Sequence, residues 1–139
     1  MKVAIVYSTT TGNTEAMANA IKDSVLSNGA EIVFGTPENV DGSSALECDV
    51  LLLGSPAMGD EVLEDSMEDW FVGIEGSLSG KEIAVFGSYD WGDGQWLRDW
   101  EERIKNNGGV ITTENLKINL TPDDAGIAEC KDWATKAIK

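Results

Sequence analysis

Short, continuous apolar runs alternate along this chain with longer stretches whose apolar residues recur at helical spacing. The apolar runs predict five strands, at Lys2–Tyr7, Glu31–Phe34, Val50–Gly54, Ile83–Gly87, and at Val110–Thr113 together with Leu116–Ile118. The longer stretches predict helices at Thr14–Asn28, Glu61–Ile74, Gly94–Asn107 and Pro122–Ile138, with at most a short helix in Val40–Cys48. Gly29 is expected to end the first helix in the left-handed conformation.

This alternation predicts an α/β fold. Strands that are apolar along their whole length are buried on both faces, which is typical of a parallel sheet with helices on either side. We therefore expect a doubly wound five-stranded parallel sheet, and residues 1–139 are expected to form a single domain because no linker or repeat interrupts them. In such sheets ligands bind beyond the carboxyl ends of the strands, where the strand order reverses, so the loops after the first, third and fourth strands are the candidates.

Hydroxyl side chains crowd the first of these loops. Ser8 and the four threonines of Thr9–Thr14 surround Gly12 at the turn from strand to helix. A helix N-terminus presents unpaired N–H groups and the positive end of the helix dipole, so hydroxyl donors around it suit a phosphate, whereas simple N-capping needs only one of them. A nucleoside-triphosphate loop would end in Gly-Lys-Ser/Thr and a dinucleotide loop would show G-x-G-x-x-G, and neither occurs. A single terminal phosphate held by neutral donors fits best.

The other two loops offer surfaces for a planar group. Ser55–Glu61 follows the third strand, and its Gly59 allows the next peptide to turn either way, while Met58 is apolar and polarisable. Ser88–Gly94 follows the fourth strand, and Trp91 in it would be exposed unless a planar ligand covers it. An ordinary turn and a Trp91 folded onto the core are the alternative interpretations.

Composition narrows the possible functions. The 10 Lys and Arg residues against 25 Asp and Glu residues give a net charge of −15, which excludes charge-driven binding to nucleic acid or anionic membranes. The absence of histidine excludes Ser-His-Asp and Cys-His catalysis and histidine-ligated metals. Cys48 and Cys130 form no C-x-x-C motif, which excludes a zinc ribbon and a thioredoxin-like centre. Since no apolar run suits a signal peptide or a membrane span, a cytoplasmic protein is expected.

Three segments together resemble the flavodoxin family, namely Thr11–Thr14, Ala57–Glu61 and Ser88–Gly94. The likeness covers essentially the whole chain, and it is to the short-chain type from anaerobic bacteria because no long insertion interrupts Val110–Ile118. It implies the strand order 2-1-3-4-5 and non-covalently bound FMN at the point of reversal.

The resemblance also implies roles for individual residues. The FMN phosphate would be held by Thr9, Thr11, Asn13 and Thr14 and by backbone N–H groups of the same loop. Met58 and Trp91 would enclose the isoalloxazine ring. The Gly59–Asp60 peptide would turn its carbonyl toward N5 on one-electron reduction, and Glu61 would accept a hydrogen bond from N3–H. The complete implied site, which includes no catalytic residue and no metal, is Thr9, Thr10, Thr11, Gly12, Asn13, Thr14, Ser55, Pro56, Ala57, Met58, Gly59, Asp60, Glu61, Ser88, Tyr89, Asp90, Trp91, Gly92 and Asp93.

Acidic residues are concentrated beside the expected ring. From Asp23 to Gly80 there are 13 acids and no Lys or Arg, and six of the acids lie within Asp60–Asp69. Negative charge disfavours a flavin anion, which leads to the hypothesis of a low-potential one-electron carrier that cycles between semiquinone and hydroquinone. Its partners would be basic-surfaced redox enzymes, bound transiently and salt-sensitively by a monomer. A flavin or quinone reductase, a dedicated activator of one enzyme and a binding module without redox chemistry are the alternatives.

Overall fold

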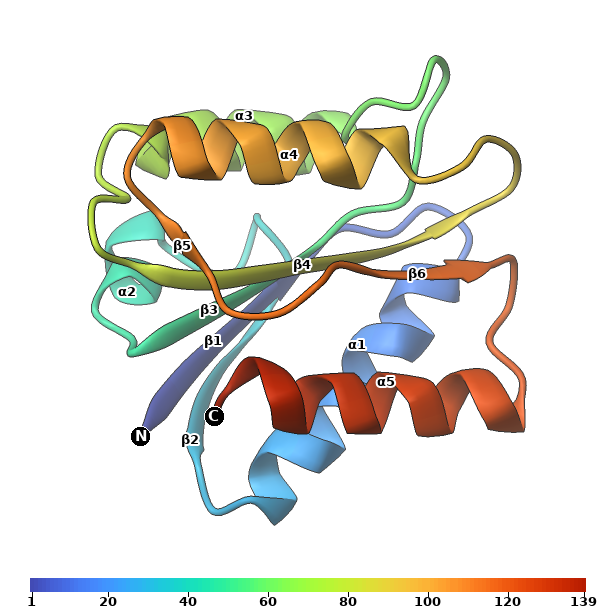
Figure 1. Ribbon diagram of the computed structural model, residues 1–139, viewed down its shortest axis with the longest axis horizontal. Coiled ribbons are helices and arrows are strands. Elements are labelled where there is room, and N and C mark those ends of the chain that lie inside the picture. Colours follow the sequence, from blue (N-terminus) through green and yellow to red (C-terminus); the bar gives the residue numbers. More distant parts are fainter.

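In the computed structural model, which describes residues 1–139, a parallel sheet lies between two layers of helices (Figure 1). The strands are β1 (Lys2–Tyr7), β2 (Glu31–Gly35), β3 (Val50–Gly54), β4 (Glu82–Tyr89), β5 (Val110–Ile111) and β6 (Leu116–Asn119). The helices are α1 (Asn13–Ser27), α2 (Gly42–Leu46), α3 (Asp65–Glu75), α4 (Gln95–Asn106) and α5 (Asp124–Ala137). The expected alternation of strands and helices is therefore present.

The strand order β2-β1-β3-β4-β5 confirms the expected 2-1-3-4-5 topology, and every pair is parallel. The fifth position of the sheet is shared by two segments. Residues of β5 pair with the start of β4, at Glu82 and Ile83, and residues of β6 pair with its end, from Phe86 to Tyr89. Both segments therefore extend the same edge of β4, and the chain leaves the sheet between them.

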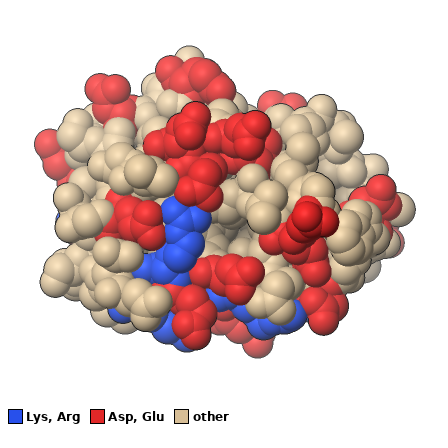
Figure 2. All heavy atoms as spheres, turned by 90° about the horizontal axis from the view of Figure 1, so that it is seen from above, with Lys and Arg blue, Asp and Glu red and all other residues tan.

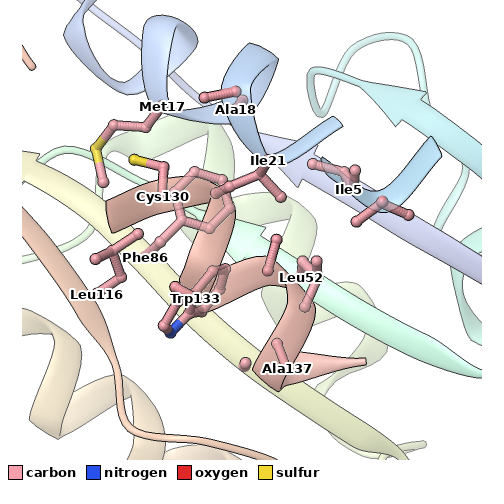
Figure 3. Close-up of a cluster of buried hydrophobic side chains, with 14 of the residues drawn as sticks. Ile5, Met17, Ala18, Ile21, Leu52, Phe86, Leu116, Cys130, Trp133 and Ala137 are labelled. Atoms are coloured by element: carbon pink, nitrogen blue, oxygen red, sulfur yellow. The ribbon is translucent and has the colours of Figure 1, made fainter. Parts of the chain in front are cut away.

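Each face of the sheet carries its own apolar core. Alternate residues such as Ile5, Leu52 and Phe86 face α1 and α5. Figure 3 shows this side, with Cys130 and Trp133 of α5 projecting toward Phe86, whose ring lies 5.7 Å from that of Trp133. The intervening strand residues face α2, α3 and α4 on the other side. Burial on both faces explains why the strands are apolar along their length.

Helix α3 begins four residues later than the predicted Glu61–Ile74, at Asp65. The residues from Glu61 to Glu64 form a turn and an N-cap in place of the predicted helical turn. Met58 and Val62 pair as an antiparallel bridge, which places Glu61 in the turn with φ 57°. Glu64 has an extended backbone, and its carboxylate accepts from the first-turn N–H groups of Ser66 and Met67 as the N-cap. The other long helices keep their predicted positions to within two residues, and Gly29 adopts the expected left-handed φ of 84°.

The loops after β1, β3, β4 and β6 gather at one edge of the sheet, on the right of Figure 1. Parallel pairing requires this, because the carboxyl ends of parallel strands lie at the same edge. No helix combines the length and the apolar character needed to cross a bilayer.

Two glycines allow a matched test of this packing. A Cβ added to Gly54 in β3 would stand 2.4 Å from the ring of Phe86, whereas one added to Gly73, exposed on α3, meets nothing within 4 Å. We predict that Gly54→Ala lowers the free energy of unfolding of the apoprotein by about 1–3 kcal/mol, because overpacking a core forces its neighbours to shift. Gly73→Ala is expected to raise it by about 0.5–1 kcal/mol, because glycine disfavours helix. Urea unfolding measures both free energies. Equal stabilities of the two variants would contradict the close packing of Gly54 against Phe86.

Candidate functional site

Helix α1 begins without a side-chain cap. Its N-cap residue, Gly12, has φ 89°, and its own N–H donates to Thr9 Oγ1 at 3.1 Å. Nothing lies within 4 Å of the position where a Gly12 Cβ would stand. Glycine suits this left-handed position, and the N–H groups of the first helical turn keep their hydrogen-bonding capacity for an anion.

A cavity of about 220 Å³ opens beside this helix terminus. Its walls come from the loops after four strands: Thr10, Thr11, Asn13, Pro56, Ala57, Ser88, Tyr89, Asp90 and Leu120. Neither lysine nor arginine is among them. The cavity therefore combines hydroxyl and amide groups with a bare helix terminus, which suits a phosphate held by neutral donors.

Two hydroxyl groups connect the first loop to β4. Thr14 Oγ1 and Ser88 Oγ lie 2.6 Å apart, and both side chains are buried. Thr9 is used within its own loop, where its hydroxyl accepts from Gly12. Thr9 and Thr14 therefore shape the loop without lining the cavity, whereas Thr10 and Thr11 line it.

The segment after β3 forms a tight hairpin. Met58 and Val62 exchange two backbone hydrogen bonds of 2.9 Å each, and the turn between them contains Gly59 with φ 46° and Glu61 with φ 57°. Ser55 is fully buried, where its Oγ accepts from Glu64 N at 3.0 Å and its carbonyl accepts from Trp96 Nε1 at 3.0 Å. The hairpin tip is thus exposed while its base is fixed to α3 and α4.

Glu61 connects this hairpin to α4. Its Oε1 accepts from the backbone N–H groups of Gly94 and Gln95, at 3.1 and 2.8 Å, and so occupies the N-terminus of that helix. Its Oε2 makes no hydrogen bond within the chain and is free to accept one from a ligand. A Cβ on Gly92 would stand 2.5 Å from the Glu61 carboxyl carbon, so this close contact requires glycine.

A second cavity, of about 190 Å³, lies between the hairpin and the loop after β4. Ala57, Met58, Gly59, Glu61, Asp90 and Trp91 line it. Ala57 and Asp90 also line the first cavity, so the two are adjacent. The Trp91 side chain is 61% exposed, as expected for an indole that no part of the chain covers. Met58 and Trp91 thus border one space from two different loops.

The predicted site residues divide into two groups. Those that line either cavity are Thr10, Thr11, Asn13, Pro56, Ala57, Met58, Gly59, Glu61, Ser88, Tyr89, Asp90 and Trp91. Those that lie in the same loops without lining a cavity are Thr9, Gly12, Thr14, Ser55, Asp60, Gly92 and Asp93. Several of the second group hold the loops in place, as Ser55 and Thr14 do.

Leu120 was missed by the sequence analysis. It follows β6, whose carboxyl end lies at the same edge of the sheet as those of β1, β3 and β4. The rule that ligands bind beyond the carboxyl ends of strands applies to the last strand as well. The sequence therefore contains a positional signal for Leu120, in the loop after the last predicted strand.

Another cavity, of about 420 Å³, lies between the connection of β5 to β6 and helix α5. Its lining includes the charged residues Glu114, Glu129, Asp132 and Lys136, and the indole N–H of Trp133 donates to Glu114 O at 2.7 Å. It includes Ala125 in the first turn of α5, but Asp123 already caps that helix by accepting from Gly126 N–H, so the terminus is not bare as that of α1 is. Nor does any group of His, Cys, Asp and Glu side chains form a metal site.

Comparison with known proteins agrees with this geometry. The family model described as flavodoxin matches residues 5–133. The chain belongs to the flavodoxin family. It is 43% identical to a flavodoxin of Clostridium beijerinckii over 133 residues, covering 95% of this chain and 96% of that one. It is 41% identical to a flavodoxin of Megasphaera elsdenii over 138 residues, covering 99% and 98%. The solution structure of the two-electron reduced Megasphaera protein superimposes with a TM-score of 0.87 over 97% of each chain.

Membership in the flavodoxin family establishes the general function. The chain is an FMN-binding electron carrier that acts with partner redox enzymes, and it is not itself an enzyme. The residues present fit FMN, because a bare helix terminus with hydroxyl neighbours adjoins a cavity bordered by Met58 and Trp91. The confirmed likeness is to short-chain members, as expected from the uninterrupted segment Val110–Ile118.

Glu64, the N-cap of α3, lies at the base of the hairpin, and its contribution to stability can be tested through its dependence on pH. Burial alone would raise the pKa of Glu64, but hydrogen bonds from the hydroxyl and N–H of Ser66 and from Met67 N–H lower the pKa below its ordinary 4.5. This contribution to stability is present above pH 4.5 and is lost as the pH falls through the lowered value.

We therefore predict that Glu64→Ala lowers the free energy of unfolding by about 1 kcal/mol at pH 7, a loss typical of a removed N-cap. The difference from the unsubstituted protein should shrink at acidic pH, below the ordinary glutamate value. Asp69→Ala, at an exposed position of α3, is the control. Urea unfolding across pH measures this, and a difference that is independent of pH would contradict the charged cap.

Proposed function

We propose that this chain is a low-potential one-electron carrier, in which residues 1–139 act as a single FMN-binding unit. The observation that supports this proposal is that the uncapped N-terminus of α1 adjoins a cavity without a cationic side chain. When bound, FMN supplies chemistry in which electrons pass one at a time. The chain's own contribution is to hold the phosphate, enclose the ring and set the local electrostatic field.

The phosphate would be held by neutral groups. The first-turn N–H groups of α1 and the side chains of Thr10, Thr11 and Asn13 adjoin the same cavity. The predicted contacts of Thr9 and Thr14 remain part of the proposal. The Thr9 hydroxyl accepts from Gly12 N–H, which leaves its own O–H free to donate, and in the Thr14–Ser88 pair only one of the two O–H groups is used. Backbone and hydroxyl donors bind an anion without adding a fixed positive charge.

The ring would lie between Met58 and Trp91, which border the second cavity from opposite loops. Glu61 Oε2 is free to accept from a ring N–H, while Oε1 keeps the α4 terminus in place. The turn Gly59–Asp60 is exposed, and Gly59 has no neighbour at its Cβ position. This peptide therefore has space to turn its carbonyl toward or away from the cavity, at the small cost that glycine allows.

Carboxylates around the cavity disfavour additional negative charge inside it. Asp90 lines both cavities and Asp60 lies at the hairpin tip, and neither has a cationic partner among the ion pairs of the chain. At an effective dielectric of about 20, a like charge about 10 Å away costs about 1.7 kcal/mol before salt screening. Each such carboxylate would thus lower a one-electron potential by about 70 mV.

The surface favours partners of positive charge. Figure 2 looks onto the α3 and α4 side, where acidic side chains predominate and surround the few basic ones. Exposed Val62 and Trp91, at 54% and 61%, add apolar surface near the cavity opening. We infer transient, salt-sensitive docking of basic redox enzymes to a monomeric carrier, since steering by opposite charge raises association rates more than affinity. A cytoplasmic location remains part of the proposal.

Reconstitution tests the proposed function directly. Apoprotein titrated with FMN is expected to bind one equivalent tightly and to turn yellow. Stepwise reduction is expected to show two separate one-electron steps, with a distinct long-wavelength spectrum between them and the second step at the lower potential. A protein that ignores FMN, or that takes up both electrons in one step, would refute the proposal.

Charge neutralisation tests the origin of the low potential. Asp60→Asn and Asp90→Asn are each expected to raise the lower potential by tens of millivolts, up to about 70 mV at low salt. The shift should diminish as ionic strength increases. Glu31→Gln, at the exposed amino end of β2 and thus at the opposite edge of the sheet, is the matched control. An equal shift in the control would show that net charge, and not these carboxylates, sets the potential.

A further inference from the structure

Leu120 combines an unfavourable backbone conformation with an exposed position that is unfavourable for leucine. It follows β6 with φ 59°, a left-handed conformation that costs about 1–2 kcal/mol for a residue with a Cβ. Its side chain is also 49% exposed, although leucine gains from burial. Packing within the chain therefore accounts for neither feature, and such outliers cluster at ligand sites.

Hydrogen bonds hold this residue in place from two directions. On one side, Leu120 N donates to Tyr89 O at 2.8 Å, and Asn119 Nδ2 donates to Tyr89 O at 3.1 Å and to Asp90 O at 3.3 Å. On the other side, Thr121 Oγ1 donates to Asn13 Oδ1 at 2.9 Å. The segment Asn119–Thr121 thus bridges the loop after β4 and the start of α1.

Those two connections place Leu120 at the wall of the first cavity. The other walls beside the helix terminus are largely polar, with Thr10, Thr11 and Asn13 among them. With a ligand bound in this cavity, an aliphatic side chain at its wall would reduce the access of water to the neutral donors. Hydrogen bonds to an anion are stronger where water is excluded, and this cavity has no lysine or arginine to compensate for competing water.

We propose that Leu120 is an additional FMN-binding residue, which covers the phosphate-bearing side chain of the cofactor and shields it from water. This inference rests on the proposed function, since it assumes that the first cavity receives that part of FMN. The backbone strain is maintained by the bonds of Asn119 and Thr121, and burial of the leucine against the cofactor offsets it.

Substitutions of Leu120 separate cofactor binding from folding. Leu120→Gly removes both the side chain and the left-handed strain, so the urea midpoint of the apoprotein is expected to stay the same or rise. The dissociation constant for FMN, measured by quenching of flavin fluorescence, is expected to rise about tenfold, because about half of a leucine side chain no longer becomes buried. Leu120→Asn, which tolerates the left-handed region, should weaken binding similarly. Leu120→Met should retain the affinity.

Leu26→Ala is the matched control, because Leu26 is 48% exposed on α1 and lines neither cavity. It is expected to leave the FMN dissociation constant unchanged. The inference is overturned if Leu120→Gly or Leu120→Asn binds FMN as tightly as the unsubstituted protein. It is also overturned if Leu120→Gly lowers apoprotein stability along with affinity, since that result indicates a structural role. Failure of the unsubstituted protein to bind FMN would instead refute the proposed function itself.

Discussion

A phosphate group that binds to this protein must approach a chain with a net charge of −15. The cavity proposed for it contains neither lysine nor arginine. Coulomb repulsion would oppose its binding unless local dipoles and hydrogen bonds supply a favourable field. In the proposed site the uncapped N-terminus of α1 would provide that field, because Gly12 adopts a left-handed conformation and no side chain occupies the first-turn N–H groups. A capping serine or aspartate at this position would satisfy those groups and remove the anion site.

The four loops at this edge are also connected to one another. Thr14 is bonded to Ser88, Glu61 to the terminus of α4, and Asn119 to the backbone of Tyr89. These bonds join segments separated by at least 30 residues in sequence, so each of these loops is held by a distant segment of the chain as well as by its own strand. Such connections restrict the free protein to conformations in which the cavity already exists, which reduces the ordering cost of binding.

The sequence predicted most of the fold because its strands are continuous apolar runs, and only a sheet covered on both faces buries every residue of Val50–Gly54. It failed at the start of α3, because the residues from Glu61 to Glu64 include neither glycine nor proline and are compatible with a helix. The bridge between Met58 and Val62 and the cap formed by Glu64 are tertiary preferences that local pattern does not contain.

In the site too, features that depend on local sequence could be predicted and those that depend on tertiary contacts could not. Glycine and threonine in Thr9–Thr14 predict a phosphate loop because their chemistry is local to one turn, and Thr10 and Thr11 do line the first cavity. Glu61 could be assigned to the site, but its bond to Gln95 depends on how two distant loops meet. The only sequence signal for Leu120 is its position after the last strand, because leucine rarely adopts positive φ and its residue type does not indicate a site.

Ion pairs involve only a few of the carboxylates, and neither of the two that line the second cavity, Glu61 and Asp90. Arg103 of α4 is bonded to Glu68 and Glu75 of α3, and hydrogen bonds from Arg103 lower the pKa of Glu68. The same guanidinium lies 4.9 Å from the centre of the Phe71 ring, so it connects the two helices while neutralising acids on their surface. Asp60 and Asp90 have no such partner. Unpaired negative charge therefore remains in the two loops that border the second cavity, where it would act on the cofactor and on an approaching partner.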